Sequence, residues 1–255
     1  MTQIPPLNAV DPPLFDFYQG GRGNILLICE HGGNAMPQSF RLLGLDPGDM
    51  NTHAAIDLGA RTLTETLAAT MDVSAICANY SRLIIDLNRF PDAPDLIPAN
   101  CENKPVPGNS NLTAHARDLR RQEFYDPFHD HIRDWLDRRA AAGTPSAVVT
   151  LHSYTPTLGK TARAEEICIV SNTDRRLADP ALNDFRQAGY KVGDNKPFDG
   201  RRRVSATFNR HGDDRGIPCL MIEYRNDLLQ DKTMAPVLAA QTAAILNSNL
   251  LRLGF

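Results

Sequence analysis

Short, nearly continuous apolar segments alternate along this chain with longer segments whose apolar residues recur every three or four positions. The short segments are typical of strands buried on both faces of a sheet. They predict strands at residues 25–29, 73–78, 83–86, 147–151, 167–171 and 219–224. The longer segments are typical of amphipathic helices packed on a core.

Three helices are predicted from such apolar stripes. The stripes are Ile56, Ala60, Leu63 and Leu67; Phe124, Phe128, Ile132 and Trp135; and Met234, Leu238, Gln241 and Ile245. Alternating strands and helices predict an α/β fold, with a mostly parallel (mixed) sheet and helices on both faces. No internal repeat or linker divides the chain, so we expect residues 1–255 to form a single domain.

Two long polar segments interrupt this alternation. Residues 90–111 contain five prolines and little periodicity, which predicts a long surface loop. Loops of that length in folded domains are usually functional or disordered. Residues 193–216 carry the run Arg201, Arg202 and Arg203, which is more typical of a solvated face than of a substrate clamp.

Composition excludes several classes of protein. The chain is 42% hydrophobic and 22% charged with a net charge of -3, unlike a disordered tail or a nucleic-acid binder. Its first residues lack the pattern of a secretory signal, and no segment approaches the about 18 apolar residues of a membrane span. Five cysteines without a C-x-x-C spacing predict buried free thiols in a reducing compartment. We therefore expect a cytoplasmic protein that acts on a small molecule.

Polar residues gather at the ends of the predicted strands, where ligands bind in open α/β sheets. They are Glu30, His31, Asp86, Asn88, Arg89, His152, Ser153, Glu223 and Arg225. Histidines, carboxylates and arginines in this placement predict a site for a divalent metal and an anionic substrate.

His31 and His152 are the predicted metal ligands, because each lies at the end of a separate strand. Imidazole and carboxylate ligands suit zinc or a similar divalent ion. His129 and His131 cannot share a helix face, and His53 and His115 are typical of exposed helix starts. A serine hydrolase is disfavoured because no G-x-S-x-G motif is present.

Gly32 and Gly33 follow His31 directly and have two compatible explanations. They can form a tight turn between a strand and the next segment. They can also leave the space beside the metal open to substrate or water.

Five motifs spread over nearly the whole chain, ICEHGGNAMP, SRLIIDLNR, LHSYTP, FNRHG and IEYRNDLL, carry a family resemblance. The set resembles the N-formylglutamate amidohydrolase family, which is similar to the zinc carboxypeptidases in fold and site. The resemblance implies that Asn88 and Arg89 hold a substrate carboxylate and that Glu223 is the general base.

The third metal ligand is not fixed by this resemblance. The carboxypeptidases have a glutamate three residues after the first histidine, where this chain has Asn34. Asp57 is the preferred candidate, followed by Glu30 and Asn34. As an alternative, Asp57 is only a solvated carboxylate on a helix.

Four further residues complete the predicted site. Arg82 or Arg225 is expected to bind a second carboxylate or the developing oxyanion, and Asp86 is grouped with the substrate-binding residues. As an alternative, Arg82 only pairs with Asp86. His211 is expected either to carry a second proton or to cap a loop.

The expected function is therefore metal-dependent hydrolysis of the amide bond of a small N-acyl amino acid, such as N-formylglutamate. The alternative is a metal-free carboxylate-binding protein that keeps Arg89 and Arg225 but has no catalytic activity.

Overall fold

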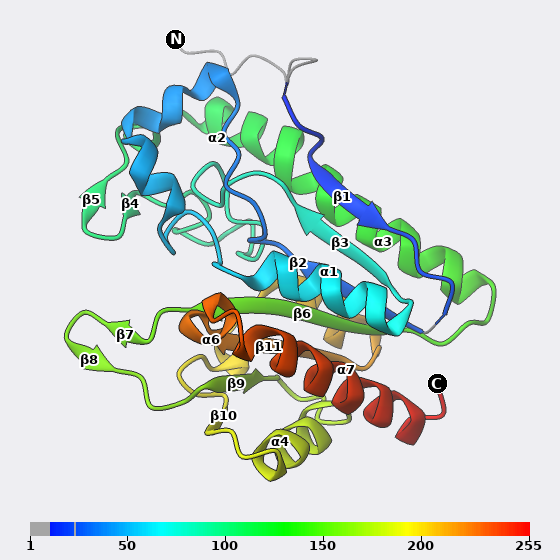
Figure 1. The fold of residues 1–255 in the computed structure, drawn as a ribbon. Coiled ribbons are helices and arrows are strands. Elements are labelled where there is room, and N and C mark those ends of the chain that lie inside the picture. The colour runs from blue at the N-terminus through cyan, green and yellow to red at the C-terminus, as the bar shows by residue number, and fades with distance from the viewer. Residues whose placement is uncertain (1–10, 23) are drawn as a thin grey trace.

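A seven-stranded sheet forms the centre of the computed structural model (Figure 1). Its strands are β1 (Phe15–Tyr18), β2 (Ile25–Cys29), β3 (Ser74–Ala78), β6 (Ala147–Tyr154), β9 (Ile167–Val170), β10 (Val192–Asp194) and β11 (Cys219–Arg225). The structure describes residues 11–22 and 24–255. Residues 1–10, where no secretory signal was recognised in the sequence, lie outside these ranges.

The strand order is β1-β3-β2-β6-β11-β9-β10. The four central strands β3, β2, β6 and β11 are parallel. β1 pairs antiparallel with β3, and β9 pairs antiparallel with β11. The predicted α/β fold with a mixed, mostly parallel sheet is confirmed.

Helices cover both faces of this sheet. They are α1 (Ala60–Met71), α2 (Ala114–Arg120), α3 (Asp126–Ala141), α4 (Ala178–Gln187), α5 (Ala206–His211), α6 (Asn226–Gln230) and α7 (Met234–Arg252). The apolar residues of α1, α4, α6 and α7 form one core with the sheet, and those of α3 and α5 form the other. Figure 1 shows α1 and α7 in front of the sheet and α3 behind it.

Shorter elements complete the fold. There are two small hairpins, β4 (Asn100–Cys101) with β5 (Lys104–Pro105) and β7 (Thr157–Leu158) with β8 (Thr161–Ala162). Both lie at the left in Figure 1, beyond the end of β6. A π-helical turn, Arg121–Tyr125, joins α2 to α3. Turns of 3-10 type span Gln38–Gly44, Pro47–Asn51, Pro107–Asn109, Gly200–Arg202 and Asp213–Arg215.

One predicted strand, at residues 83–86, is wrong. These residues form turns and irregular backbone, although Leu83 and Ile84 are fully buried. Side chains satisfy their carbonyl groups in place of a neighbouring strand. Asn109 Nδ2 donates to the Leu83 carbonyl at 2.8 Å, and Arg120 Nη1 donates to the Ile84 carbonyl at 2.8 Å. The apolar run is therefore buried without belonging to the sheet.

The other five predicted strands and the three predicted helices are present. β6 continues to Tyr154, so His152 lies within the strand and not after it. Residues 90–111 form a long connection that includes the β4–β5 hairpin. All five cysteines are free and buried, as expected. None of the helices in the described part of the chain has both the length and the apolar character needed to cross a bilayer.

Candidate metal centre and active-site cavity

A cavity of about 410 Å³ opens at the carboxyl ends of the parallel strands. Its charged lining residues are the carboxylates Asp57, Asp86, Asp95 and Glu223, the arginines Arg82, Arg89 and Arg163, and the histidines His31, His53 and His152. This is the edge at which open α/β sheets bind their ligands.

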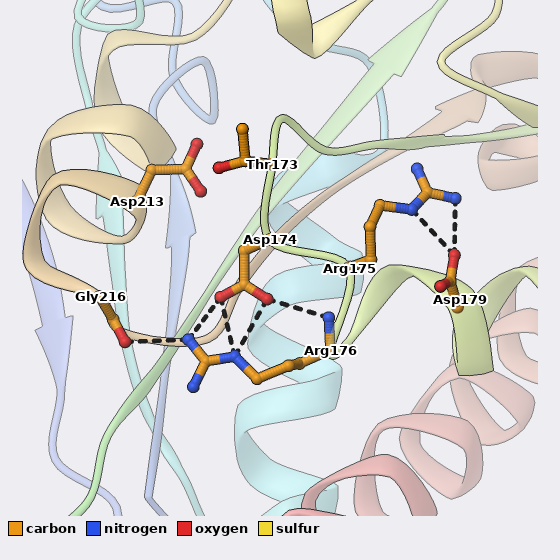
Figure 2. Close-up of a pocket in the computed structure, with 7 residues that line it drawn as sticks. All are labelled: Thr173, Asp174, Arg175, Arg176, Asp179, Asp213 and Gly216. Carbon is orange, nitrogen blue, oxygen red and sulfur yellow. Dashed lines mark hydrogen bonds and ion pairs between the residues drawn. The ribbon is translucent and has the colours of Figure 1, made fainter.

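A second pocket, of about 590 Å³, lies on the surface near the start of α4 (Figure 2). Its arginines already have carboxylate partners. Arg175 Nε lies 2.8 Å from Asp179 Oδ1, and Arg176 Nε lies 3.0 Å from Asp174 Oδ2. Because these charges neutralise one another, the cavity at the strand ends is the stronger candidate for a functional site.

Strand β2 carries His31 to this cavity through a tight turn. At Gly33, an added Cβ would lie 2.1 Å from the carbonyl oxygen of Asn79. The obstruction is backbone, which cannot swing aside as a flexible side chain can. The close packing of the turn therefore excludes any larger residue at this position, which supports the turn explanation for the glycines.

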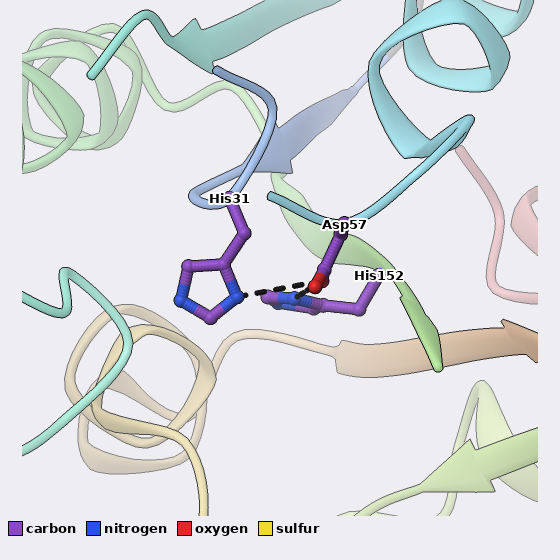
Figure 3. A group of neighbouring side chains, drawn as sticks. All are labelled: His31, Asp57 and His152. Carbon is purple, nitrogen blue, oxygen red and sulfur yellow. Dashed lines mark hydrogen bonds and ion pairs between the residues drawn. The ribbon is translucent and has the colours of Figure 1, made fainter. Parts of the chain in front are cut away.

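His31, Asp57 and His152 form a buried cluster at the cavity wall (Figure 3). Nδ1 of His152 lies 2.9 Å from Asp57 Oδ2, and Nδ1 of His31 lies 3.4 Å from the same oxygen. The centroids of the two imidazole rings are 4.9 Å apart. One potential ligand atom from each residue thus faces a common point.

The remaining nitrogen of each histidine contacts a buried carboxylate. Nε2 of His31 lies 2.7 Å from Asp86 Oδ1, and Nε2 of His152 lies 3.1 Å from Glu30 Oε2. A proton on Nε2 of His31 donates to Asp86, and a proton on Nε2 of His152 faces Glu30 Oε2 in an ion-pair contact, which leaves the Nδ1 lone pairs directed at Asp57. This is the arrangement in which a carboxylate orients a metal-binding histidine.

The electrostatics of the cluster also fit a divalent cation. Burial disfavours the charged imidazoles, yet Asp86 raises the pKa of His31 and Glu30 raises the pKa of His152 well above its ordinary value. Oδ1 of Asp57 is buried without a hydrogen bond, and its neighbours Arg82 Nη1 and His53 Nδ1 lie 3.2 and 3.4 Å away as ion-pair contacts. Two ligands bonded at 2.0–2.1 Å to a tetrahedral ion are about 3.4 Å apart. The two histidine nitrogens lie 2.9 and 3.4 Å from Asp57 Oδ2, and the three ligand atoms lie within 4.8 Å of one another. The three residues therefore fit a divalent metal ion.

The position of Asp57 excludes the alternative of a solvated helix carboxylate. Asp57 lies in the turn before α1 and is 2% exposed. Its backbone N–H donates to the His31 carbonyl at 3.0 Å, which fixes the two residues together. The other candidates face elsewhere: Asn34 Nδ2 donates to the Met50 carbonyl at 3.0 Å, and Glu30 contacts the far nitrogen of His152.

Glu223 lies near the end of β11, directly opposite His152 in the pairing of β11 with β6. It lines the cavity and is 8% exposed. Within the described ranges, no hydrogen bond or ion pair involves its carboxylate. Burial raises the pKa of Glu223 to about 7, while His152 opposes this shift. A carboxylate in this state is suited to exchange a proton with a ligand.

Arg82, Asp86, Asn88 and Arg89 line another part of the cavity. Arg82 Nη1 lies 3.2 Å from Asp57 Oδ1 and 3.1 Å from His31 Nδ1. Arg89 Nε pairs with Asp95 Oδ2 at 2.8 Å, while Asn88 Oδ1 accepts from the Ser205 hydroxyl at 2.6 Å. The alternative that Arg82 only pairs with Asp86 does not hold, because its carboxylate partner is Asp57.

The family model for N-formylglutamate amidohydrolases matches residues 23–230, which is most of the chain. The chain belongs to the N-formylglutamate amidohydrolase family. The family's name denotes hydrolysis of an amide, in agreement with the expected class of enzyme. The family resemblance inferred from the sequence is thereby confirmed.

Solved structures share this fold over nearly the whole chain. The gene product Atu2144 from Agrobacterium tumefaciens is 31% identical, with 98% of this chain and 99% of that chain covered and a TM-score of 0.93. N-formylglutamate amidohydrolase from Ralstonia eutropha JMP134 is 16% identical, with 94% and 96% covered and a TM-score of 0.71. At 16% identity the second likeness concerns the fold alone. No curated protein matches the sequence significantly.

Two residues expected at the site of this family member lie elsewhere. Arg225 does not line the cavity, and its guanidinium pairs with Asp227 at 2.8 Å. His211 is buried on α5 and stacks on His129, whose Nδ1 lies 2.9 Å from His211 Nε2. Their positions do not support direct roles in substrate binding or proton transfer.

Other residues at the cavity were not recognised in the sequence. His53, expected to be exposed at a helix start, lines the cavity with Nδ1 3.4 Å from Asp57 Oδ1. Arg163 lines it from the end of the β7–β8 hairpin. Asp95 reaches it from the polar segment at residues 90–111. For His53, the only feature of the sequence that indicated a place in the site was its spacing of four residues from Asp57 in HAAID.

Proposed function

We propose that this protein is a metal-dependent amidohydrolase that cleaves the amide bond of a small N-acyl amino acid. N-formylglutamate is the first candidate substrate. The observation that carries the proposal is the pair His31 and His152, each with one nitrogen beside Asp57 and the other beside a buried carboxylate. Family membership supports the same class of reaction.

His31, His152 and Asp57 would hold the metal, and their imidazole and carboxylate donors favour zinc. A bound zinc ion polarises an amide carbonyl and lowers the pKa of water to about 7. The protein contributes the fixed ligand geometry, because all three side chains are buried and the two histidines are oriented by Asp86 and Glu30.

Glu223 is proposed as the general base. It accepts a proton from the attacking water and passes it to the leaving nitrogen, a transfer typically worth about 10²–10⁴-fold in rate. Its free carboxylate lies in the same cavity as the proposed ligands. Its raised pKa supports its use both as a base and, once protonated, as an acid.

Three further residues are proposed to bind the substrate. Arg89 and Asn88 hold the α-carboxylate, with Nη2 of Arg89 left without a hydrogen-bond partner in the described part of the chain. Arg82 contributes positive charge beside the reacting carbonyl, where negative charge develops during attack.

Arg89→Ala is expected to raise KM about 10- to 100-fold for substrates with a free α-carboxylate, because a hydrogen-bonded charge is lost. For the corresponding esters, KM should change little. Steady-state kinetics on matched acid and ester pairs test this, with the exposed Arg201→Ala as control. Equal losses on acids and esters would show that Arg89 is structural.

Asp86 is proposed to orient His31 and not to touch substrate. Asp86→Asn should lower the affinity for zinc about 10- to 100-fold, as expected when the partner of a metal-binding histidine is altered. Competition with a chromophoric chelator measures this, with the exposed Asp92→Asn as control. Unchanged zinc affinity together with a raised KM would return Asp86 to the substrate-binding role predicted from the sequence.

The alternative function, a metal-free carboxylate-binding protein, is favoured by one contact. Arg82 Nη1 lies 3.1 Å from His31 Nδ1, so the guanidinium itself can balance the charge of Asp57 at the position considered for the ion. Metal content after purification and dialysis separates the two functions. A stoichiometric divalent ion supports the enzyme, and its absence supports the binding protein.

The proposed activity is tested by incubating the protein with a panel of N-acyl amino acids, with and without added zinc. Release of the free amino acid in the presence of zinc is the expected result. No release from any member of the panel would contradict the proposal.

A further inference from the structure

Arg163 lies at the end of the β7–β8 hairpin and lines the cavity. Its backbone is held on both sides. Its N–H donates to the Pro156 carbonyl at 2.9 Å, and its carbonyl accepts from Arg225 Nη1 at 3.5 Å. The base of the guanidinium side chain is therefore fixed beside the cavity, although neither the strands nor the family motifs contain it.

The guanidinium of Arg163 packs on aromatic rings and lacks an acidic partner. Its central carbon lies 5.2 Å from the ring centroid of Tyr154 and 5.5 Å from that of Phe198. Nη1 donates to the carbonyl of Thr155 at 3.1 Å and reaches its hydroxyl at 3.3 Å. Across residues 11–22 and 24–255, no carboxylate pairs with it, and Nε and Nη2 have no hydrogen-bond acceptor.

This distinguishes Arg163 from the other two arginines of the cavity. Arg82 pairs with Asp57, and Arg89 pairs with Asp95. A half-buried cation is normally paired, because partial removal from water is costly. The planar fork of donors on arginine matches a carboxylate with two parallel hydrogen bonds. The free donors of Arg163 thus provide a binding point for an anionic group of a ligand.

We propose that Arg163 binds the side-chain carboxylate of an N-acyl dicarboxylic amino acid and so makes the cavity selective for acidic over neutral side chains. The inference rests on the proposed function, in which Arg89 takes the α-carboxylate. Two arginines from separate elements then serve the two carboxylates of one substrate.

The test compares N-formylglutamate with N-formylglutamine, which has nearly the same shape but a neutral side chain. The zinc-loaded wild type should prefer N-formylglutamate about 10- to 100-fold in kcat/KM. Arg163→Met, which keeps the packing of the stem on the rings, should lose this preference with little change on N-formylglutamine. Arg163→Lys should retain part of it. The exposed Arg202→Met is the matched control and should behave as wild type.

Binding of glutarate and of its monoamide, measured by calorimetry, separates this inference from the proposed function. Neither compound contains the scissile N-acyl bond, so no hydrolysis is needed. Tighter binding of glutarate by the wild type, lost in Arg163→Met, would support the site even if no N-formyl compound is cleaved. Equal binding of the two compounds, no binding of either, or an unchanged preference in a folded Arg163→Met variant would overturn it.

Discussion

Replacing Glu223 with glutamine is expected to lower kcat by at least about 10²-fold while zinc binding stays near the wild-type level. Glutamine keeps the shape of the side chain but cannot accept the proton of water. Glu223 is suited to this experiment because no described residue pairs with its carboxylate, so the substitution breaks no ion pair. Turnover, zinc content and melting temperature should be measured on the same preparation.

The pH dependence gives a second readout of Glu223. Burial raises its pKa to about 7, and a general base works only when deprotonated. Wild-type kcat should therefore fall as the pH drops through the pKa of Glu223, at or below about 7 when a bound cation lowers that pKa. The residual kcat of the glutamine variant should not show this fall at low pH.

A glutamate outside the cavity provides the control for this variant. Glu165 pairs with Lys196 at 2.7 Å and does not line the cavity, so Glu165→Gln should keep wild-type turnover. Unchanged turnover in Glu223→Gln with a lowered melting temperature would mean that Glu223 is only structural. The carboxylate-binding function would then be favoured.

Asp57→Asn is expected to have the other large effect. Asp57 is the shared neighbour of both histidines, and an amide is a poor ligand for zinc-type ions. Zinc affinity should fall by more than about 10²-fold. Altering a residue that only hydrogen-bonds to a metal ligand already lowers metal affinity about 10- to 100-fold. Activity at limiting zinc should fall in parallel.

Stability must be followed in the same experiment, because Asp57 also pairs with Arg82. Breaking a buried pair by altering one partner typically costs about 3–5 kcal/mol. Asp179→Asn, at the pocket of Figure 2, is the matched control and should leave both properties unchanged. A folded Asp57→Asn variant that binds zinc as tightly as the wild type would exclude Asp57 as a ligand.

The sheet could be predicted from the sequence where strands are buried on both faces. β2 reads ILLIC and β11 begins with CLMI, both continuous apolar runs, and His31 and Glu223 at or near their ends line the cavity. The short edge strands β1 and β10 were not predicted because they contain few residues and are only partly buried. Continuous apolar runs identify the central strands, and the partly buried edge strands lack such runs.

The wrong prediction of a strand at residues 83–86 has a different cause. Side chains distant in sequence donate hydrogen bonds to the carbonyl groups of this segment and of the residues that follow it. His129 Nε2 donates to the Leu87 carbonyl at 2.9 Å, and the Tyr125 hydroxyl donates to the Arg89 carbonyl at 2.9 Å. Tyr125 ends the π-helical turn that precedes α3. No local pattern in the sequence indicates that a helix supplies these donors.

Only some residues of the candidate site could be located from the sequence. His31, His152 and Glu223 could be located because they lie at or near the ends of predicted strands. Arg163 could not, since it follows a two-residue strand in a polar hairpin and its importance comes from a missing partner. Asp57 was a candidate only because the resemblance left a ligand unfilled. Its burial, which supports the choice, depends on tertiary packing.

Hydrolysis is proposed to depend on an ion held by His31, Asp57 and His152. The most direct test is to titrate metal-stripped protein with zinc while bound zinc and hydrolysis of N-formylglutamate are measured together. Activity should be absent at the start and rise in proportion to bound zinc, reaching its plateau at one ion per chain. Full activity in the stripped protein, or no activity once one ion per chain is bound, would contradict the proposal.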